Sequence, residues 1–199
     1  MSAQFWDERY GGDVYAYGRE PNEHLRAEAA RIPSGPVLCL AEGEGRNAVF
    51  LAERGHDVTA VHFSREGIRK TELLAKERGV SVRAVLADLA TFVPERSDYA
   101  GVVAIFAHLP PDVRKRVHGW VASALRPGGV FVLEAYTPAQ LAHGSGGPKN
   151  PELLMTLDGL RAELAPLVID VGREVEREIH EGAFHGGPSA TVQVVARRK

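Results

Sequence analysis

The sequence contains 199 residues, which is enough for one domain with a sizeable core, and we expect residues 1–199 to form that single domain. Hydrophobic residues make up 44%, charged residues 25%, and the formal net charge is −2. This composition is typical of an ordered globular protein and gives no basic excess that would indicate a nucleic-acid partner. The N-terminus lacks a positively charged start followed by an apolar run, and no run of about 18 apolar residues occurs. We therefore expect a cytoplasmic protein without a membrane partner, and the sequence does not indicate an oligomeric state.

After an N-terminal segment, short runs rich in β-branched residues alternate with helical patterns, which is typical of βαβ units around a mostly parallel sheet. Strands are predicted near 37–41, 57–62, 82–86, 101–106, 129–135, 167–175 and 190–197. Helices are predicted near 22–31, 46–54, 65–78, 111–125 and 156–164. The turn-rich segment 180–189 contains no helix, so it predicts an antiparallel hairpin of the last two strands. The predicted fold class is α/β, with a doubly wound, mostly parallel sheet and an antiparallel last strand.

The one cysteine of the sequence, Cys39, lies inside the apolar run of the first predicted strand. A lone cysteine cannot form an intrachain disulfide. We interpret it as a small buried hydrophobic residue, in preference to a redox or nucleophilic role.

The segment VLCLAEGEGRNAVFLA, residues 37–52, begins as a buried strand, passes through a glycine-containing turn and continues as a helix. In a doubly wound sheet the first such turn lies at the ligand-binding edge. Gly43 and Gly45 allow a ligand close to the backbone, and the helix that begins near Arg46 presents unpaired amide groups. The pattern also fits G-x-G-x-x-A through Ala48, so the motif alone leaves a dinucleotide site and a turn without any ligand as alternatives.

Two polar residues follow the next strands at the same predicted edge. The second strand ends at His62, 19 residues after Gly43, where a carboxylate ordinarily holds ribose hydroxyls. A neutral imidazole can accept one hydrogen bond from a hydroxyl, but it lacks the charge and the second oxygen of a carboxylate. After the third strand, Asp88 either accepts from an adenine amino group or caps the helical turn that follows.

The runs VLCLAEGEGRNAVFLAERGHDVTAV, ADL and LRPGGVFVLEAYTP resemble the class I S-adenosylmethionine-dependent methyltransferases. They are most similar to the small bacterial type that includes tellurite-resistance and thiopurine methyltransferases, and the resemblance extends from FWDERYGGDVYAYGREPN to the end of the chain. It implies a Rossmann-like seven-stranded sheet that binds S-adenosyl-L-methionine over the carboxyl ends of the first strands. The cofactor contacts predicted at these positions are Ala41, Glu42, Gly43, Glu44, Gly45, Arg46, Asn47, His62, Phe63, Ser64, Ala87, Asp88, Leu89 and Phe106.

The first motif departs from the form D-L-G-C-G that is commonest in this family. Cys39, Ala41 and Glu42 occupy the places of the acid, the first glycine and the cysteine. We hypothesise that Glu42 returns a carboxylate three positions later and meets the ammonium group of the cofactor's methionine moiety. The alternative is a solvated turn residue, because glutamates are usually exposed.

Methyl transfer from a sulfonium needs alignment more than a catalytic base, because the methyl group is already activated. Thiols and chalcogen anions attack directly, whereas an alcohol or amine must lose a proton. His108, just past the fourth strand, is the candidate base, with a turn-closing role as the alternative, and Tyr136 is the second catalytic candidate. The predicted substrate contacts are Tyr17, Arg19, His108, Glu134 and Tyr136.

The N-terminal segment, residues 1–30, is implied by the resemblance to cover the cofactor and the substrate. Arg19 is a candidate partner for the methionine carboxylate or for an anionic substrate, with a surface position as the alternative. Asn22 is either part of this cover or a helix cap.

Two other patterns are interpreted without a ligand. His180, Glu181 and His185 lack the H-E-x-x-H spacing of zinc proteases and are assigned to a hairpin turn, so no metal site is predicted. The glycine-rich segment 143–151 is predicted to be a mobile flap beside the site or a simple connection.

The function predicted by these features is methyl transfer from S-adenosyl-L-methionine to a small-molecule substrate. Thiols and chalcogen oxyanions are the acceptors suggested by the resemblance. The alternative is a non-catalytic S-adenosylmethionine-binding module, and a nicotinamide oxidoreductase is a weaker third hypothesis.

Overall fold

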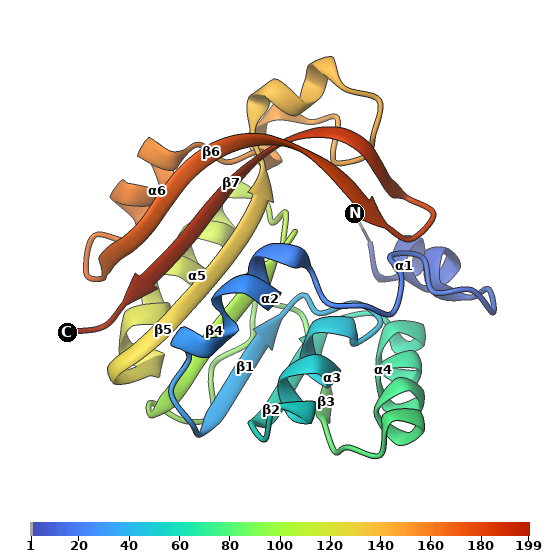
Figure 1. The fold of residues 1–199 in the computed structure, drawn as a ribbon, viewed down its shortest axis with the longest axis horizontal. Helices are drawn as coiled ribbons and strands as arrows, with labels where there is room; N and C mark the ends of the chain where they lie inside the picture. The colour runs from blue at the N-terminus through green and yellow to red at the C-terminus, as the bar shows by residue number, and fades with distance from the viewer. Residues whose placement is uncertain (1) are drawn as a thin grey trace.

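The computed structural model describes residues 2–199 as a single α/β sheet structure with helices on both faces (Figure 1). The strands are β1 (Pro36–Leu40), β2 (Asp57–His62), β3 (Arg83–Leu86), β4 (Tyr99–Ile105), β5 (Leu125–Tyr136), β6 (Val168–Glu181) and β7 (His185–Arg197). The α-helices are α1 (Ala3–Tyr10), α2 (Glu23–Glu28), α3 (Arg46–Glu53), α4 (Arg65–Arg78), α5 (Pro111–Ala124) and α6 (Leu157–Glu163). Short 3₁₀ helices are η1 (Ala29–Arg31), η2 (Pro138–Ala142) and η3 (Pro151–Leu153).

The seven strands form one sheet in the order β3-β2-β1-β4-β5-β7-β6. All neighbours from β3 to β5 pair in parallel, while β7 is antiparallel to both β5 and β6. The predicted doubly wound, Rossmann-like sheet with an antiparallel last strand is therefore confirmed. Its strand order reverses between β1 and β4, which is where such sheets bind ligands.

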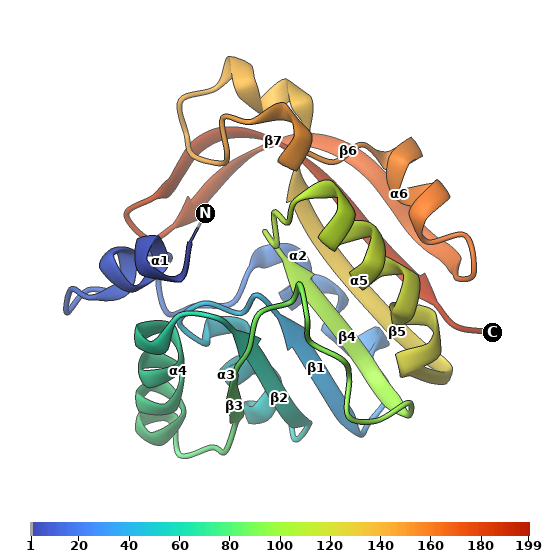
Figure 2. The same ribbon diagram turned by 180° about the vertical axis from the view of Figure 1, so that it is seen from behind.

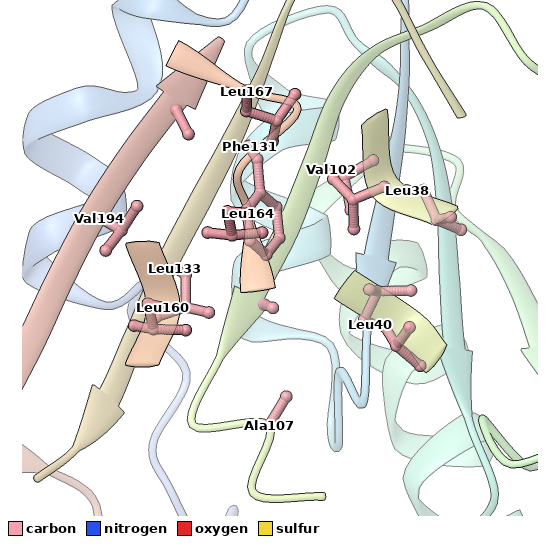
Figure 3. Packing of buried hydrophobic residues seen from close by; sticks show 14 of the residues in the cluster. Leu38, Leu40, Val102, Ala107, Phe131, Leu133, Leu160, Leu164, Leu167 and Val194 are labelled. Carbon is pink, nitrogen blue, oxygen red and sulfur yellow. The ribbon is translucent and has the colours of Figure 1, made fainter. Parts of the chain in front are cut away.

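The core lies in two layers because neighbouring side chains of each buried strand point to opposite faces. On one face Val37 and Cys39 of β1 pack with residues of α2 and α3, and Cys39 is a buried small residue as predicted. On the other face α5 lies over β4 and β5 and α6 lies beside β6 and β7, as Figure 2 shows from behind. Figure 3 shows this second layer, in which Leu160 and Leu164 pack beside Leu133 and Phe131 of β5.

Several predicted boundaries need correction. The last hairpin is much longer than expected, because β6 continues to Glu181 and β7 begins at His185, so its turn is only residues 182–184. The helix predicted at 22–31 is α2 followed by the 3₁₀ turn η1, and α1 has no predicted counterpart. The predicted cap of α4 is confirmed, since Ser64 Oγ accepts from the Gly67 amide at 3.1 Å.

The long hairpin reaches past the sheet toward the N-terminal segment and α1 (Figure 1). At its tip the Ala183 amide donates to the Ala16 carbonyl at 3.0 Å. Gly182 has φ +68, and a Cβ there would lie 2.4 Å from the Gly18 nitrogen. Only glycine permits this close backbone contact between the two segments.

A buried carboxylate, Glu134 of β5, joins the hairpin to the rest of the sheet. The side chain is fully buried, and Arg177 of β6 donates to both of its oxygens at 2.9 and 3.0 Å. Asn22, the cap of α2, donates to it at 2.6 Å, and Thr191 and Gln193 of β7 donate at 3.0 and 2.9 Å. Burial alone would raise the pKa of Glu134, but the Arg177 guanidinium and the amide donors lower it, so the carboxylate stays ionised.

We expect Glu134→Ala to destabilise the fold by about 3–5 kcal/mol, because it removes the buried carboxylate to which Arg177, Thr191 and Gln193 donate and leaves these donors unsatisfied. The free energy of unfolding from urea titration measures this. The control is Glu176→Ala, which removes an exposed carboxylate from β6, the strand of Arg177, and should change stability by less than about 0.5 kcal/mol. Equal effects of the two substitutions would contradict the role given to Glu134.

Candidate cofactor-binding site

A cavity of about 530 Å³ lies at the carboxyl ends of the parallel strands. This volume falls within the range of roughly 300–1,000 Å³ that is usual for cofactor and small-molecule sites. Its floor is the glycine turn after β1 together with the loops after β2, β3, β4 and β5. Its cover is formed by α1, by Tyr17 and by the tip of the β6–β7 hairpin.

The glycine turn has the left-handed backbone that a close-approaching ligand needs. Ala41 has φ 51, Gly43 has φ 72 and Gly45 has φ 92. A left-handed alanine is strained by about 1 kcal/mol or more, and such strain concentrates at functional sites. Ala41 and Gly43 line the cavity, and a Cβ on Gly43 would lie 3.0 Å from Tyr10 Oη.

The prediction for Gly45 needs a correction. This residue is outside the set that lines the cavity. A Cβ on Gly45 would lie 2.7 Å from Thr71 Cα, so a glycine is required there by the packing of α3 against α4. The missing side chain therefore serves the fold and not the approach of a ligand.

Glu42 lies at the base of the cavity and caps α3. Its Oε1 accepts from the amides of Asn47 and Ala48 at 2.9 and 2.8 Å, which satisfies two of the free amides at the start of the helix. Burial of the carboxyl group raises the pKa of Glu42 to about 7, against the opposing effect of these amides. Glu42 is thus a cap of α3, a role that the sequence did not predict, and its second oxygen has no hydrogen-bond partner among the described residues.

The next polar residues of the turn hold the covering segments in place. Glu44 pairs with Lys70 of α4 at 2.8 Å and accepts from the Ala16 amide at 2.8 Å. Arg46 pairs with Glu181 at 2.6 Å. Glu44 and Arg46 line the cavity, but the charges of their side chains are neutralised by these partners.

Asn22 and Asn47 complete the attachment of the N-terminal segment. Asn47 Oδ1 accepts from the Asn22 amide at 2.9 Å, and the Asn22 side chain donates to Glu181 at 2.9 Å. Asn22 is also the helix cap that the sequence allowed, because its Oδ1 accepts from the Leu25 amide at 3.0 Å.

His62, at the end of β2, lines the cavity as predicted, but its hydrogen-bonding role is reversed. Its Nδ1 lies 3.0 Å from the Ser64 amide nitrogen and accepts that hydrogen. The burial of the ring lowers its pKa to about 4, so the imidazole is neutral and its remaining proton is on Nε2. The nitrogen left for a ligand is therefore a donor, whereas we expected an acceptor.

Ser64, predicted as a cofactor contact, does not line the cavity. Its hydroxyl caps α4 and donates to Asp7 of α1 at 2.5 Å. This bond connects α1 to the start of α4. The residue thus acts on the cover of the cavity and not on its contents.

The loop after β3 provides one edge of the cavity through Ala87, Asp88 and Leu89, and Phe63 lines it as well. Asp88 Oδ1 accepts from the Ala90 amide at 2.8 Å, which is the capping role that the sequence left open. The Asp88 side chain is exposed.

Aromatic residues form the other side of the cavity, beyond β4 and β5. Phe106 has a left-handed backbone, with φ 52, and its ring stacks on Tyr136 at 4.7 Å between centroids. His108 Nδ1 lies 2.9 Å from the Leu153 carbonyl, and its Nε2 lies 3.4 Å from the Tyr136 amide. Both ring nitrogens of His108 thus contact backbone groups, which is the turn-closing alternative, and burial lowers its pKa to about 4.

Two predicted substrate contacts lie outside the cavity. Arg19 is at the surface, where it pairs with Glu77. Glu134 points into the sheet, where its carboxylate is fully used by the network described above. In a strand the two faces alternate, and the sequence did not show that the face of Glu134 carries its partners from the neighbouring strands β7 and β6 and lies beneath α2.

Residues 1–30 were expected as a segment to cover the site, but apart from Tyr17 the residues that form the cover were not singled out from the sequence. Phe5, Trp6, Arg9 and Tyr10 of α1 and Phe184 and His185 of the hairpin all line the cavity. A signal for α1 was present, because Trp6 and Tyr10 are four residues apart and stack at 5.3 Å, with Ser2 as the helix cap. Nothing in the local sequence indicated that Phe184 and His185 line the cavity.

His180 and Glu181 end β6 and His185 begins β7, so these residues flank the hairpin turn that was predicted to contain them. Glu181 is bonded to Arg46, and although burial opposes it, His185 and Arg46 lower the pKa of Glu181 to about 2. Among residues 2–199 we find no group of three His, Cys, Asp or Glu side chains arranged to hold a metal. The same part of the chain contains no helix that is both long and apolar enough to cross a membrane.

Comparisons with known proteins agree with this geometry. Residues 37–129 match the family of methyltransferase domains. The 2-heptyl-1-hydroxyquinolin-4(1H)-one methyltransferase of Mycobacteroides abscessus is 26% identical over 70% of this chain and 64% of its own. The tRNA 5-carboxymethoxyuridine methyltransferase of Escherichia coli is 32% identical over 54% of this chain and 41% of its own. The structure of TehB from Haemophilus influenzae superimposes with a TM-score of 0.71 and 17% identity, over 99% of this chain and 67% of that one.

The solved structure of an S-adenosylmethionine-dependent methyltransferase from Methanosarcina mazei has the same fold, with a TM-score of 0.70 and 18% identity over 90% of this chain and 98% of that one. The methyltransferase-domain match covers residues 37–129, which are less than half of this chain and include the glycine turn. The matches span less than two thirds of the length of either curated relative. The fold that the resemblance implies is confirmed, and the domain match agrees with the family that the sequence resembles.

We predict that His62 donates its Nε2 hydrogen to a ribose oxygen of the cofactor. His62→Leu should weaken binding of S-adenosylhomocysteine up to about tenfold, and His62→Gln, whose amide can donate, should recover part of this loss. Isothermal titration measures both affinities. Nitrogen NMR of the His62 ring reports the tautomer directly, and a proton found on Nδ1 would contradict the prediction.

Glu42 gives a second prediction, on stability against pH. Its pKa in the folded state, about 7, is above the ordinary value of 4.5, so the native state binds the proton more tightly than the unfolded state. The contribution of Glu42 therefore falls as pH rises from 4.5 to 7 and is constant above that range. Urea titrations across this range should show a smaller decline for Glu42→Gln than for the unaltered protein, and parallel curves would contradict the assignment.

Proposed function

We propose that this protein transfers a methyl group from S-adenosyl-L-methionine to a small molecule. The observation that supports this best is the cavity itself. The strained turn after β1 lines one side of it, aromatic residues line the other side, and the same covering segments lie over both. The domain match and the fold independently support methyl transfer.

The residues of the first half of the cavity suit the cofactor. The backbone at Gly43 leaves room for its methionine part, the free oxygen of Glu42 suits its ammonium group, His62 suits the ribose and Asp88 the adenine amino group. When bound, the cofactor supplies a methyl group activated by a sulfonium. Tyr17, the hairpin and α1 would keep water from this region and hold the two reactants in line.

A small acceptor is favoured over a nucleic acid, although the names of the relatives include one of each. The mycobacterial relative is named for a hydroxyquinolone and the E. coli relative for a tRNA. In this chain the net charge is −2, and Arg46 in the cavity is neutralised by Glu181. Phosphate backbones are bound by excess positive charge, which this arrangement does not provide.

The state of His108 favours an acceptor that needs no base. Both of its nitrogens contact backbone groups, and its pKa is lowered to about 4, so it is a poor proton acceptor at neutral pH. Thiols and chalcogen oxyanions, which the family resemblance suggested, can react without a base from the protein. We therefore propose that His108 and Tyr136 shape the acceptor side of the cavity rather than remove a proton.

Isothermal titration tests this function first. We expect S-adenosylhomocysteine to bind with micromolar affinity and NADH not to bind. Binding near pH 7 should release protons, because an ammonium group beside Glu42 lowers its pKa. Transfer of a labelled methyl group to thiols, selenite and tellurite then separates an enzyme from a non-catalytic binding module. Preference for NADH would overturn the proposal, and binding without turnover of any acceptor would favour the module.

A further inference from the structure

The glycine-rich segment between η2 and η3, residues 143–150, contributes to the cavity without a role assigned so far. Its residues Gly146, Gly147 and Pro148 line the cavity. Figure 1 shows this connection between β5 and α6 beside the long β6–β7 hairpin. It was expected from the sequence to be a mobile flap or a simple connection. The contacts of the segment indicate whether it moves.

A buried glutamine, Gln140 of η2, attaches the segment to β7. This residue is 1% exposed. Its Nε2 donates to Ser145 Oγ at 3.0 Å and to the Gly146 carbonyl at 3.1 Å, while its Oε1 accepts from the Ala190 amide at 2.8 Å. One side-chain amide thus joins the segment to the strand. Detachment of the segment would leave buried polar groups without partners, which is costly.

Ser145 makes a second attachment to the same strand. Its hydroxyl donates to the Pro188 carbonyl and lies 2.9 Å from Ser189 Oγ. Its carbonyl oxygen accepts from the Gly186 amide at 3.3 Å. The segment is therefore bonded to β7 along residues 186–190.

The two glycines of the segment lie where no side chain fits. A Cβ on Gly147, which has φ +84, would lie 2.8 Å from the Tyr136 ring, and Tyr136 has no exposed surface. A Cβ on Gly146 would lie 2.7 Å from the Phe184 carbonyl oxygen and 3.2 Å from His185 Cδ2. Only glycine allows the backbone this close to its neighbours. The segment thus packs directly against Tyr136 and the tip of the hairpin.

We propose that residues 143–150 are a fixed wall of the acceptor side and that Gln140 is the positioning residue that holds it. The wall supports Phe184 and His185 from behind and so determines the space that an acceptor can occupy. Gln140 does not line the cavity, so it acts on the acceptor only through the wall. The rigidity of the wall is independent of the proposed function, whereas its effect on an acceptor rests on that function.

Cleavage by trypsin after the exposed Lys149 tests whether the segment is fixed. A protease cuts a native chain through its locally opened form, so the rate of cleavage reports how often the segment detaches. We expect Gln140→Met, which keeps the volume but removes the hydrogen bonds, to raise this rate at least about tenfold. The control Leu141→Ala removes an exposed side chain of the same turn and should leave the rate within about twofold. Cleavage of the unaltered protein as fast as that of Gln140→Met would overturn the proposal.

The pattern of cleavage separates local detachment from general unfolding. In Gln140→Met the rate after other lysines and arginines should rise much less than the rate after Lys149. If that variant unfolds as a whole, Ser145→Ala provides the same test, because it removes only a half-buried hydroxyl of the attachment. A local increase in neither variant would contradict the role of the attachment.

The response to a ligand separates a fixed wall from a flap that closes. Saturating S-adenosylhomocysteine should change the cleavage rate after Lys149 in the unaltered protein by less than about twofold. Protection of this bond by tenfold or more, on the order expected for a closing lid, would show a moving flap and overturn the proposal.

The kinetics of methyl transfer test the effect on the acceptor. With 2-mercaptoethanol, selenite and tellurite as acceptors of a labelled methyl group, Gln140→Met should raise the KM of the acceptor at least about fivefold. The KM of S-adenosyl-L-methionine should change by less than about twofold, and equal changes in both constants would refute the positioning role. Failure of the unaltered protein to bind S-adenosylhomocysteine would instead overturn the proposed function, and the cleavage of Gln140→Met would still decide whether the wall is fixed.

Discussion

The cavity depends on two buried carboxylates that hold the ends of the chain over the sheet. Glu134 receives hydrogen bonds from α2, β6 and β7, and Glu181 receives them from Asn22 and from Arg46 at the start of α3. Buried charges of this kind are tolerated only when every oxygen has partners. Here the partners come from separate elements, so satisfying the charges also fixes where the hairpin and the N-terminal segment lie. The cover of the site is thus a consequence of charge burial in the sheet.

Most of the fold could be predicted from the sequence because its signals are local. Alternation of β-branched runs with helical patterns gave the strands, and the absence of a helix between the last two strands gave the antiparallel end. The cap of α4 at Ser64 was also visible. The length of the last hairpin was not, because Gly186, Gly187 and Pro188 resemble a turn although they pair with β6 as strand residues. Pairing with a neighbouring strand overrides local propensity at these positions.

The site was predictable where a motif fixes the backbone and unpredictable where tertiary contacts decide the direction of a side chain. The residues predicted as cofactor contacts in the turn from Ala41 to Asn47 and at the ends of β2, β3 and β4 line the cavity, apart from Gly45 and Ser64. That the Ser64 amide donates to His62 Nδ1, which leaves Nε2 as a donor, could not be predicted from the sequence. It also could not show which face of β5 carries Glu134. Such details depend on partners that are distant in the chain or on backbone geometry that a motif does not specify.

The contact between Gly182 and Gly18 has a consequence for the chain as a whole. The cover is built from α1 and Tyr17, near the start of the chain, and from the tip of the β6–β7 hairpin, more than 150 residues later. A molecule bound in the cavity contacts both segments and therefore stabilises their association. Its binding energy adds to the buried hydrogen bonds and ion pairs that already join these segments. Proteolytic removal of either segment therefore opens the cover of the cavity, although the floor of the cavity stays intact.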